Sequence, residues 1–412
     1  MNVIFLSIAP HDPIIARDGR PFNAGNRMKA LDWPYPSVLA GSLRTMLGKM
    51  KDGNFDRDTI KALKSFRVYG PLPLSQGKIY FPAPMDLLVK EENKKRECRA
   101  YAIRPMSRPL NNEEGEGCNL PSSDLRPSML PDSVGDEFKP AKTPAFWSMD
   151  TMTNWLLNAK GECFASPPDP DDIKGRSDFL NLPQKEPRIH VMIDPCLGSS
   201  KDSMLFETIG LNLCVKGQNE EIQLAAKVEA EGEFGNLAAK IDCFNTFGGE
   251  RRLAKWNAGT IQDEWNCPKN IISGLKGKSK VRMVLATPAI FSDGWKPGWI
   301  NGRPKDKALD NWPKGLKLRL VSACTDRWKP ISGWCLEKGK QGHKPIRRLV
   351  PAGSVYFFEI EGDEDAATLA ESLWLRSVCD VEQDRKDGFG LALWGIWDYA
   401  NDETIEEQKQ EV

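Results

Sequence analysis

Arginines placed beside glycines are the most distinctive chemical feature of this 412-residue sequence. They occur in three stretches that are far apart along the chain: Arg17-Asp18-Gly19-Arg20, Gly248-Gly249-Glu250-Arg251-Arg252, and Arg385-Lys386-Asp387-Gly388-Phe389-Gly390. Glycine leaves backbone amides open, and arginine binds phosphate oxygens through paired N–H donors. Because all three stretches border predicted strands, they predict a surface that grips a sugar-phosphate chain, and they do not describe an active site.

Residues suited to catalysis are scarce in comparison. The histidines His11, His190 and His343 are isolated, and none belongs to a metal-binding spacing. Asp18 and Asp293 each precede a glycine, which is typical of a carboxylate that caps its own turn. We therefore predict no metal and no cofactor. His11 lies beside the first arginine loop, so a role as general acid or base in RNA cleavage stays open as an alternative.

The element that positions the first loop is a short strand followed by a helix. Residues 3–8, VIFLSI, form an apolar run that ends before Pro10, and a helix is predicted to begin after Pro36 with Ser37 as its N-cap. Arg44 lies one residue away from the apolar stripe of this helix. A helix start next to arginines favours phosphate binding, because its free N–H groups and positive dipole end point outward.

Three strands are predicted between residues 188 and 232, and the pattern continues in the second half. There, strands at 280–291, 316–324 and 354–362 precede a helix at 366–378 and a strand at 389–397. This order fits a ferredoxin-like split βαβ unit. The spacing of Pro288, Asp293 and Gly294 also repeats that of Pro13, Asp18 and Gly19, which hints at an internal duplication.

Composition limits the class of protein. The 57 basic and 57 acidic residues cancel, which counts against a free-standing nucleic-acid binder, yet basic and acidic clusters are separated along the chain. That separation suits a subunit that touches polyanion on one side and protein on another. The ten cysteines never form C-x-x-C, and no apolar run reaches the length of a membrane helix. We expect a cytoplasmic protein with no membrane association.

Several of these motifs resemble a known family. The segments PIIARDGRPF and PSVLAGSLRTML resemble the start of the RAMP subunits of CRISPR effector complexes. More closely, the chain is similar to the third subunits of the Cmr, or type III-B, complex, with further agreement in YFPAPMDLL, FWSMDTMTNWL, RIHVMID through MLFETIG, FGGERR, VLATPAIFSDGW and GFGLALWGIW.

The resemblance implies an α+β chain of two ferredoxin-like (RRM-like) domains, at residues 1–258 with an insertion at about 51–185, and at 259–412 with the glycine-rich loop and an acidic tail. It implies an RNA-binding subunit without nuclease activity. Such a subunit holds the repeat-derived 5′ handle of the guide RNA, docks on the large polymerase-like subunit beside a neighbouring RAMP backbone subunit, and meets target RNA indirectly.

The residues expected to bind the handle are Arg17, Arg20, Ser37, Arg44, Gly248, Gly249, Arg251, Arg252, Arg385, Gly388 and Gly390. This sequence has His11 where the family usually has an arginine before the first aspartate, which puts the contact from that position in doubt. The family also projects a hairpin that wedges the guide–target duplex. The candidate for it here is the segment 96–108, with Arg96, Arg99, Arg104 and Arg108.

Two alternatives remain beside the RNA-binding subunit. The first is a metal-independent RAMP endoribonuclease that processes CRISPR transcripts with His11 as general base. The second is an assembly module that makes no RNA contact. Convergence of Arg20, Arg251 and Gly388 on one surface would favour the RNA-binding subunit.

Overall fold

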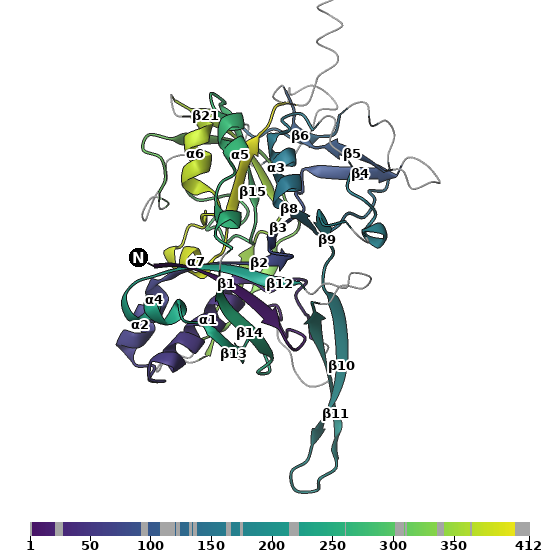
Figure 1. Ribbon diagram of the computed structural model, residues 1–412. Helices are drawn as coiled ribbons and strands as arrows, with labels where there is room; N and C mark the ends of the chain where they lie inside the picture. Colours follow the sequence, from purple (N-terminus) through teal and green to yellow (C-terminus); the bar gives the residue numbers. More distant parts are fainter. Residues whose placement is uncertain are drawn as a thin grey trace, which may run out of the picture.

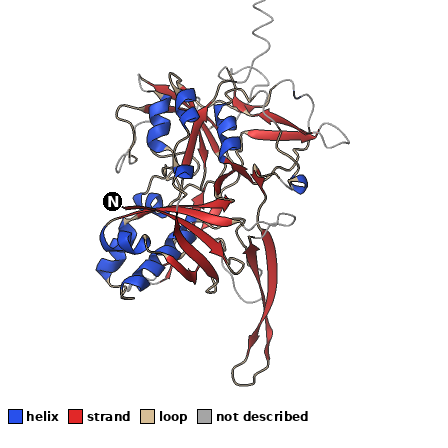
Figure 2. Ribbon diagram, viewed as in Figure 1, coloured by secondary structure: helices blue, strands red, loops and turns tan. Residues whose placement is uncertain are grey.

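The computed structural model describes residues 2–399 except 21–27, 92–97, 108–119, 121–123, 132, 133, 135–137, 162–165, 174, 175, 214–221, 260, 301–308, 310, 336–341, 363 and 364. The chain forms two lobes, each built on an antiparallel sheet, with a long hairpin projecting from one of them (Figure 1). The predicted α+β class is confirmed at this level, since helices pack beside antiparallel sheets in both lobes (Figure 2).

The first lobe contains a sheet of eight strands in the order β13-β14-β1-β12-β2-β3-β8-β9. Strand β1 is an inner strand of this sheet and lies antiparallel between β12 and β14. The strands are β1 (Asn2–Pro10), β2 (Arg67–Ser75), β3 (Lys78–Pro82), β8 (Phe146–Ser148), β9 (Phe179–Leu180), β12 (Gln223–Ala230), β13 (Asp242–Thr246) and β14 (Leu253–Gly259). Side chains alternate along β1, so that Ile4, Leu6 and Ile8 enter the core.

Helices α1 (Pro36–Lys51), α2 (Arg57–Ser65) and α4 (Gly232–Ala238) lie together beside this sheet (Figure 1). Leu39, Leu43 and Leu47 of α1 are fully buried. The prediction that Ser37 caps α1 was wrong. The N-cap residue is Tyr35, which makes no side-chain cap bond, and Pro36 fills the first helical turn, where a missing N–H costs nothing.

The second lobe contains a four-stranded sheet in the order β16-β21-β15-β22. Its strands are β15 (Lys280–Leu285), β16 (Lys317–Cys324), β21 (Val355–Glu361) and β22 (Ala392–Ile396), and its helices are α5 (Lys269–Leu275), α6 (Ala366–Leu373) and α7 (Glu382–Asp387), with a 3-10 turn at η3 (Asp263–Trp265). The predicted strands of this half are therefore present. The predicted helix at 366–378 ends earlier, at Leu373, and α7 was not predicted.

The range predicted as an insertion, about 51–185, contains α2 and the strand β2, which pairs with β12 inside the large sheet. The predicted insertion therefore starts too early. Strand β2 was not recognised in the sequence because it contains a glycine and two prolines, which are unusual inside a sheet. The range also contains β3, β8 and β9 of the same sheet. Outside that sheet it contains β4 (Leu87–Glu91), β5 (Cys98–Ala102), β6 (Arg104–Pro105), β7 (Ser128–Met129), α3 (Met149–Leu157) and η2 (Pro170–Asp172).

The projecting hairpin consists of β10 (Gln184–Ile193) and β11 (Ser200–Asn212), which pair only with each other (Figure 1). The three strands predicted in this region are thus present, but β12 leaves the other two and joins β1 and β2. Two small ribbons belong to the second half of the chain: β17 (Lys329–Ile331) pairs with β20 (Arg347–Leu349), and β18 (Trp334–Cys335) pairs with β19 (Gly342–His343).

A buried ionic cluster joins the middle segment to the second sheet. Asp86 accepts a hydrogen bond from Arg104 at 2.8 Å and another from Arg282 of β15, and all three side chains are at most 2% exposed. One carboxylate cannot neutralise two guanidinium groups, so backbone carbonyls at the C-terminal end of α3 accept the remaining hydrogen bonds. Arg104 donates to the carbonyls of Asn158 and Ala159, and Arg282 donates to that of Trp155. The negative end of the α3 dipole therefore stabilises the second charge.

Candidate nucleic-acid interface

The Arg17–Arg20 loop is held in shape by Asp18. The Asp18 side chain is 8% exposed and accepts hydrogen bonds from the backbone N–H of Arg20 at 3.0 Å and from its Nε at 2.6 Å. Arg17 donates to the carbonyl oxygen of Arg20 at 3.2 Å. Asp18 is thus the turn-capping carboxylate expected from the sequence, and it fixes one edge of the Arg20 guanidinium while 57% of that side chain stays exposed.

The turn between β13 and β14 packs directly against Ile15, two residues before the Arg17–Arg20 loop. The N–H of Gly249 donates to the carbonyl of Ile15 at 2.7 Å. Gly248 has φ +78°, and a Cβ added there would lie 2.6 Å from the same oxygen. The glycines therefore permit close approach of this turn to the segment that leads into the Arg17–Arg20 loop. Arg251 is exposed, while Arg252 pairs with Glu250 at 3.5 Å.

The Gly388–Gly390 loop behaves differently. All three residues are buried, and their amides donate to the carbonyls of Arg385, Asp384 and Pro288. A Cβ on Gly388 would lie 2.8 Å from the carbonyl of Val68 on β2, so this glycine serves contact between the lobes. The expectation of open amides at Gly388 and Gly390 was wrong. It failed because the loop is enclosed by strands from both halves of the chain.

Arg385 is enclosed with that loop. The side chain is 2% exposed and donates to the carbonyls of Cys379 at 2.9 Å and Asp380 at 2.8 Å. Of the three turns expected to converge, the turn at 248–252 contacts Ile15, which lies two residues before the Arg17–Arg20 loop, whereas Gly388 is buried.

Ser37 and Arg44 lie on α1. Ser37 is half-buried in the first turn of the helix. Arg44 is 12% exposed, forms an ion pair with Asp387 at 2.5 Å, and donates to the carbonyl of Lys386 at 3.2 Å. Its guanidinium is therefore committed to fixing α1 against α7, which leaves little of it for an RNA phosphate.

The structure describes only part of the segment 96–108 that was predicted as the duplex wedge. Arg96 and Arg108 fall outside the described residues. Arg99 belongs to the short ribbon β4–β5 and lies over the ring of Tyr101, and Arg104 is buried in the Asp86 cluster. Arg104 as a wedge residue was wrong, because its charge is taken up by Asp86, far from any projecting tip.

A long hairpin, β10–β11, projects from the first lobe (Figure 1). Large apolar side chains are exposed along it, including Ile189 at 77%, Leu197 at 78% and Leu205 at 60%. His190 stacks on Phe206 with ring centroids 5.1 Å apart, and its Nε2 lies 2.8 Å from the hydroxyl oxygen of Thr208. The ribbon is thus stiffened by a ring pair while its outer side chains remain uncovered.

A basic and aromatic patch on β17 and β20 adjoins the first loop, and sequence reasoning had not assigned it to the site. A Cβ on Gly19 would lie 2.6 Å from the backbone nitrogen of Ser332, next to the end of β17. Trp328 is 53% exposed, and the guanidinium of Arg348 lies 4.9 Å from its ring centroid. The signal in the sequence was a tryptophan followed further along the chain by the basic run that ends at Arg348.

The described residues contain no group of three or more histidine, cysteine or acidic side chains able to hold a metal ion. Within the same part of the chain, no helix is both long enough and apolar enough to cross a membrane. His11 is 69% exposed on the side chain, and its Nδ1 lies 3.7 Å from a carboxylate oxygen of Asp12.

Comparison with known proteins identifies the class. A family model described as CRISPR-associated protein (Cas_Cmr3) matches residues 6–397. The chain belongs to this Cas_Cmr3 family, and the predicted membership of the third-subunit family of type III-B effector complexes is confirmed. No curated protein matches the chain.

Solved structures give more distant likenesses. One is a chain of a type III-B Cmr-beta complex bound to cognate target RNA and AMPPnP, with 14% identity, a TM-score of 0.45 and 86% of each chain covered. Another is a chain of a Csm3–Csm4 subcomplex of the type III-A CRISPR-Cas interference complex, with 12% identity, a TM-score of 0.35, and 87% of this chain and 94% of that one covered. The family assignment depends on the family model and not on these likenesses.

Proposed function

We propose that this effector-complex subunit is a non-catalytic RNA-binding protein that holds the repeat-derived 5′ handle of the guide RNA. The observation that supports the proposal is the contact of Gly249 with Ile15, two residues before the Arg17–Arg20 loop, together with the exposure of Arg20 and Arg251. Fixed guanidinium groups on neighbouring turns neutralise successive phosphates of a single strand. Arg17 and Arg252 extend the same surface.

The Trp328–Arg348 patch supplies the part of such a site that binds bases. An exposed ring beside a guanidinium stacks on an unpaired base regardless of its identity. Because Gly19 packs against Ser332, the patch lies beside the arginine turns, within the reach of the same RNA strand.

We also assign the role of duplex wedge to β10–β11 in place of 96–108. Its exposed Ile189 and Leu205 are suited to packing against the end of a base-paired stack. The large polymerase-like subunit, the neighbouring RAMP backbone subunit and, indirectly, target RNA remain the proposed partners, in the cytoplasm.

The strand orders support the proposal of two ferredoxin-like domains, at residues 1–258 and 259–412. In the large sheet, β14, β1, β12 and β2 correspond to the fourth, first, third and second strands of one βαββαβ unit. In the small sheet, β22, β15, β21 and β16 follow the same order. The repeated Pro-Asp-Gly spacing follows the first strand of each unit, as a duplication would require.

The test is retention of guide RNA by the whole complex. We expect the triple variant Arg17→Ala, Arg20→Ala, Arg251→Ala to lose at least tenfold of the guide RNA that co-purifies with the complex. Loss of about three phosphate contacts would also lower the slope of log affinity against log salt by roughly 2. Arg57→Ala on α2 removes an exposed arginine on the helical side and serves as the matched control. Unchanged guide retention in the triple variant would exclude handle binding at this surface and favour the assembly module.

The endoribonuclease remains as a second candidate because of one contact. Asp12 accepts a hydrogen bond from the N–H of Leu253 at 3.0 Å, which lowers the pKa of Asp12, and the ionised carboxylate lies beside His11. If repeat RNA incubated with the purified chain is cleaved, and His11→Ala abolishes the cleavage, the enzyme is correct. Binding without cleavage supports the structural subunit.

A further inference from the structure

One acidic side chain, Asp32, joins the base of the projecting hairpin to the ribbon β17–β20. Its carboxylate accepts a hydrogen bond from the ammonium of Lys185 on β10 at 2.6 Å and lies 3.6 Å from the ammonium of Lys329 on β17. Asp32 itself lies between the Arg17–Arg20 loop and α1. The three side chains, which we call the Asp32 junction, are 44% to 47% exposed, so a ligand can reach them.

The Asp32 junction adjoins the proposed handle surface. Lys185 pairs with Leu211 across the hairpin, and Leu211 exchanges two backbone hydrogen bonds with Ile14, at 2.9 and 2.8 Å. Ile14 belongs to the segment that leads into the first arginine loop. On the other side, Lys329 directly follows the exposed Trp328. The junction therefore lies between the arginine loop, the exposed ring and the hairpin.

Positive charge exceeds negative charge at the junction, because one carboxylate lies between two ammonium groups. The next acid along the loop, Asp18, is bound by Arg20 at 2.6 Å and so does not reduce the excess. Burial acts to raise the pKa of Asp32, but the hydrogen bond and charge of Lys185, with the charge of Lys329, lower it overall, so Asp32 is ionised at neutral pH. One positive charge thus remains available to an anion.

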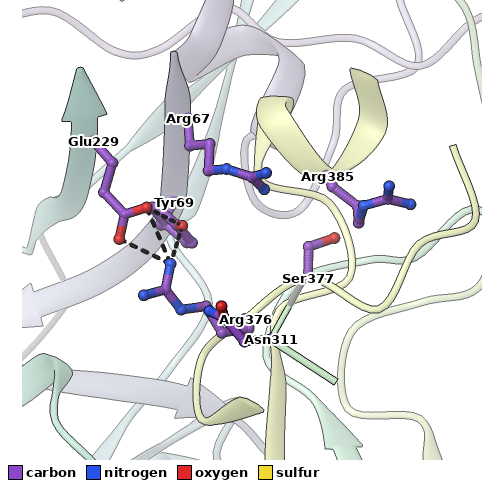
Figure 3. Close-up of a pocket in the computed structure, with 7 residues that line it drawn as sticks. All are labelled: Arg67, Tyr69, Glu229, Asn311, Arg376, Ser377 and Arg385. Carbon is purple, nitrogen blue, oxygen red and sulfur yellow. Dashed lines mark hydrogen bonds and ion pairs between the residues drawn. The ribbon is translucent and has the colours of Figure 1, made fainter. Parts of the chain in front are cut away.

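The cleft between the lobes has the opposite balance. There, Glu229 accepts hydrogen bonds from the Tyr69 hydroxyl at 2.7 Å and from Arg376 at 2.8 Å, and its side chain is 4% exposed (Figure 3). Lys227 lies 3.5 Å from the same carboxylate, and Glu371 lines the adjoining cavity. Lys227 and Arg376 thus face two carboxylates in an enclosed site, whereas the two lysines of the Asp32 junction share one carboxylate in reach of solvent.

A phosphate group presents charged oxygens as a carboxylate does, so it can contact both ammonium groups that Asp32 now holds. We propose that Lys185 and Lys329 bind one phosphate of the RNA strand as it passes from the arginine loop to the hairpin β10–β11, and that Asp32 occupies this position when no RNA is bound. The inference rests on the proposed function, because the strand is the one that the handle surface holds. RNA is favoured over an acidic peptide because the ring of Trp328, next to Lys329, is able to stack on a base.

The experiment measures guide RNA retained by the whole complex over a range of salt concentrations, for two variants whose effects should have opposite signs. We expect Lys185→Gln with Lys329→Gln to weaken retention about tenfold and to lower the slope of log affinity against log salt by about 0.7, the value for one phosphate of a single strand. Asp32→Asn removes the competing carboxylate and should strengthen retention about threefold. A gain of RNA binding in Asp32→Asn cannot come from a loss of folding.

Matched controls remove the same groups from the helical side of the first lobe. Lys49→Gln with Lys61→Gln and, separately, Asp58→Asn alter exposed residues of α1 and α2 and should leave guide retention unchanged. If the lysine variant and Asp32→Asn both lose guide RNA, the junction only fastens the hairpin and the proposal is wrong. Unchanged retention in either of them overturns it as well.

The arginine variant of the handle surface, Arg17→Ala with Arg20→Ala and Arg251→Ala, is measured beside these. Loss of guide RNA in the arginine variant, with none in the lysine variant, overturns the inference about the junction alone. Loss in the lysine variant, with none in the arginine variant, overturns the handle surface and leaves the phosphate contact of the junction standing.

Discussion

The turn at 248–252 and the loop at 385–390 have the same signature in the sequence, glycines beside arginines, yet the structure uses them in opposite ways. At the first, the glycines pack on Ile15 and leave Arg251 exposed. At the second, Gly388 packs on β2, and Arg385 is 2% exposed and donates to two carbonyls of its own chain. In both cases the glycine marks a close approach of two backbones. The neighbouring arginine is exposed at the first and buried at the second, and we therefore propose RNA binding only for the first.

The largest expected effect is on the buried side of this comparison. Arg385→Ala should lower the free energy of unfolding by about 3 kcal/mol, because it removes a buried charge and leaves two enclosed carbonyls without their donor. Urea unfolding measures this. Lys386→Ala, one residue further along α7, removes only a half-exposed pair with Glu382 and should cost less than about 0.5 kcal/mol. Equal effects of the two variants would contradict the assignment of Arg385 to packing.

Lys227 on β12 is an intermediate case, because it is a buried cation whose burial lowers the free energy of unfolding. Lys227→Met should raise the stability of the free chain at pH 7 by roughly 2 kcal/mol, because a folded pKa near 8 lies well below the usual lysine value. The unfolded chain binds more protons between about pH 8 and 10.5, so the unaltered chain regains stability as the pH rises through this window. The advantage of the variant should therefore shrink from pH 7.5 to 10. A difference in stability that is constant over this range would show that Lys227 is not destabilising when charged.

On the exposed side, Arg251→Ala alone should change the free energy of unfolding by less than about 0.5 kcal/mol. Removal of a charge-assisted phosphate contact should weaken guide retention by about 1.4 kcal/mol, or tenfold. Filter binding of guide RNA to the complex at two salt concentrations provides the measurement. A large loss of stability with no change in RNA binding would place Arg251 in the same class as Arg385.

The smallest effect is expected at Trp328. Trp328→Ala should weaken binding of the handle by about 1 kcal/mol, roughly fivefold, through loss of base stacking. Trp328→Phe should restore most of the affinity, since a ring of similar planarity remains. If neither variant changes RNA binding but the complex loses its large subunit, the exposed ring of Trp328 contacts a protein partner instead.

Local signals in the sequence predicted local structure well. The strand predicted at residues 3–8 and the strands predicted in the second half depend on patterns within a few residues, and the structure contains them. The position of β12 was not predictable in the same way. Its chain neighbour is β11, but its apolar face is buried only between β1 and β2, whose residues lie more than 140 positions earlier.

The candidate site shows the same limit. The link between Asp18 and Arg20 is local and was expected. The burial of Arg104 and Arg385 was not, because their partners are set by tertiary contacts that no spacing in the sequence reveals. Charge runs and glycine pairs therefore indicated where interaction takes place, without indicating whether its partner is RNA or the chain itself.

Helix α1 has a mechanical consequence. Its Ser42 hydroxyl accepts a hydrogen bond from the N–H of Gly248 at 3.3 Å, and Arg44, two residues later, is fastened to Asp387 beside Gly388. Helix α1 thus connects the turn at 248–252 in the first lobe with the loop at 385–390 in the second. A force that an RNA strand exerts on Arg251 would therefore be transmitted through α1 to the contact between the two lobes.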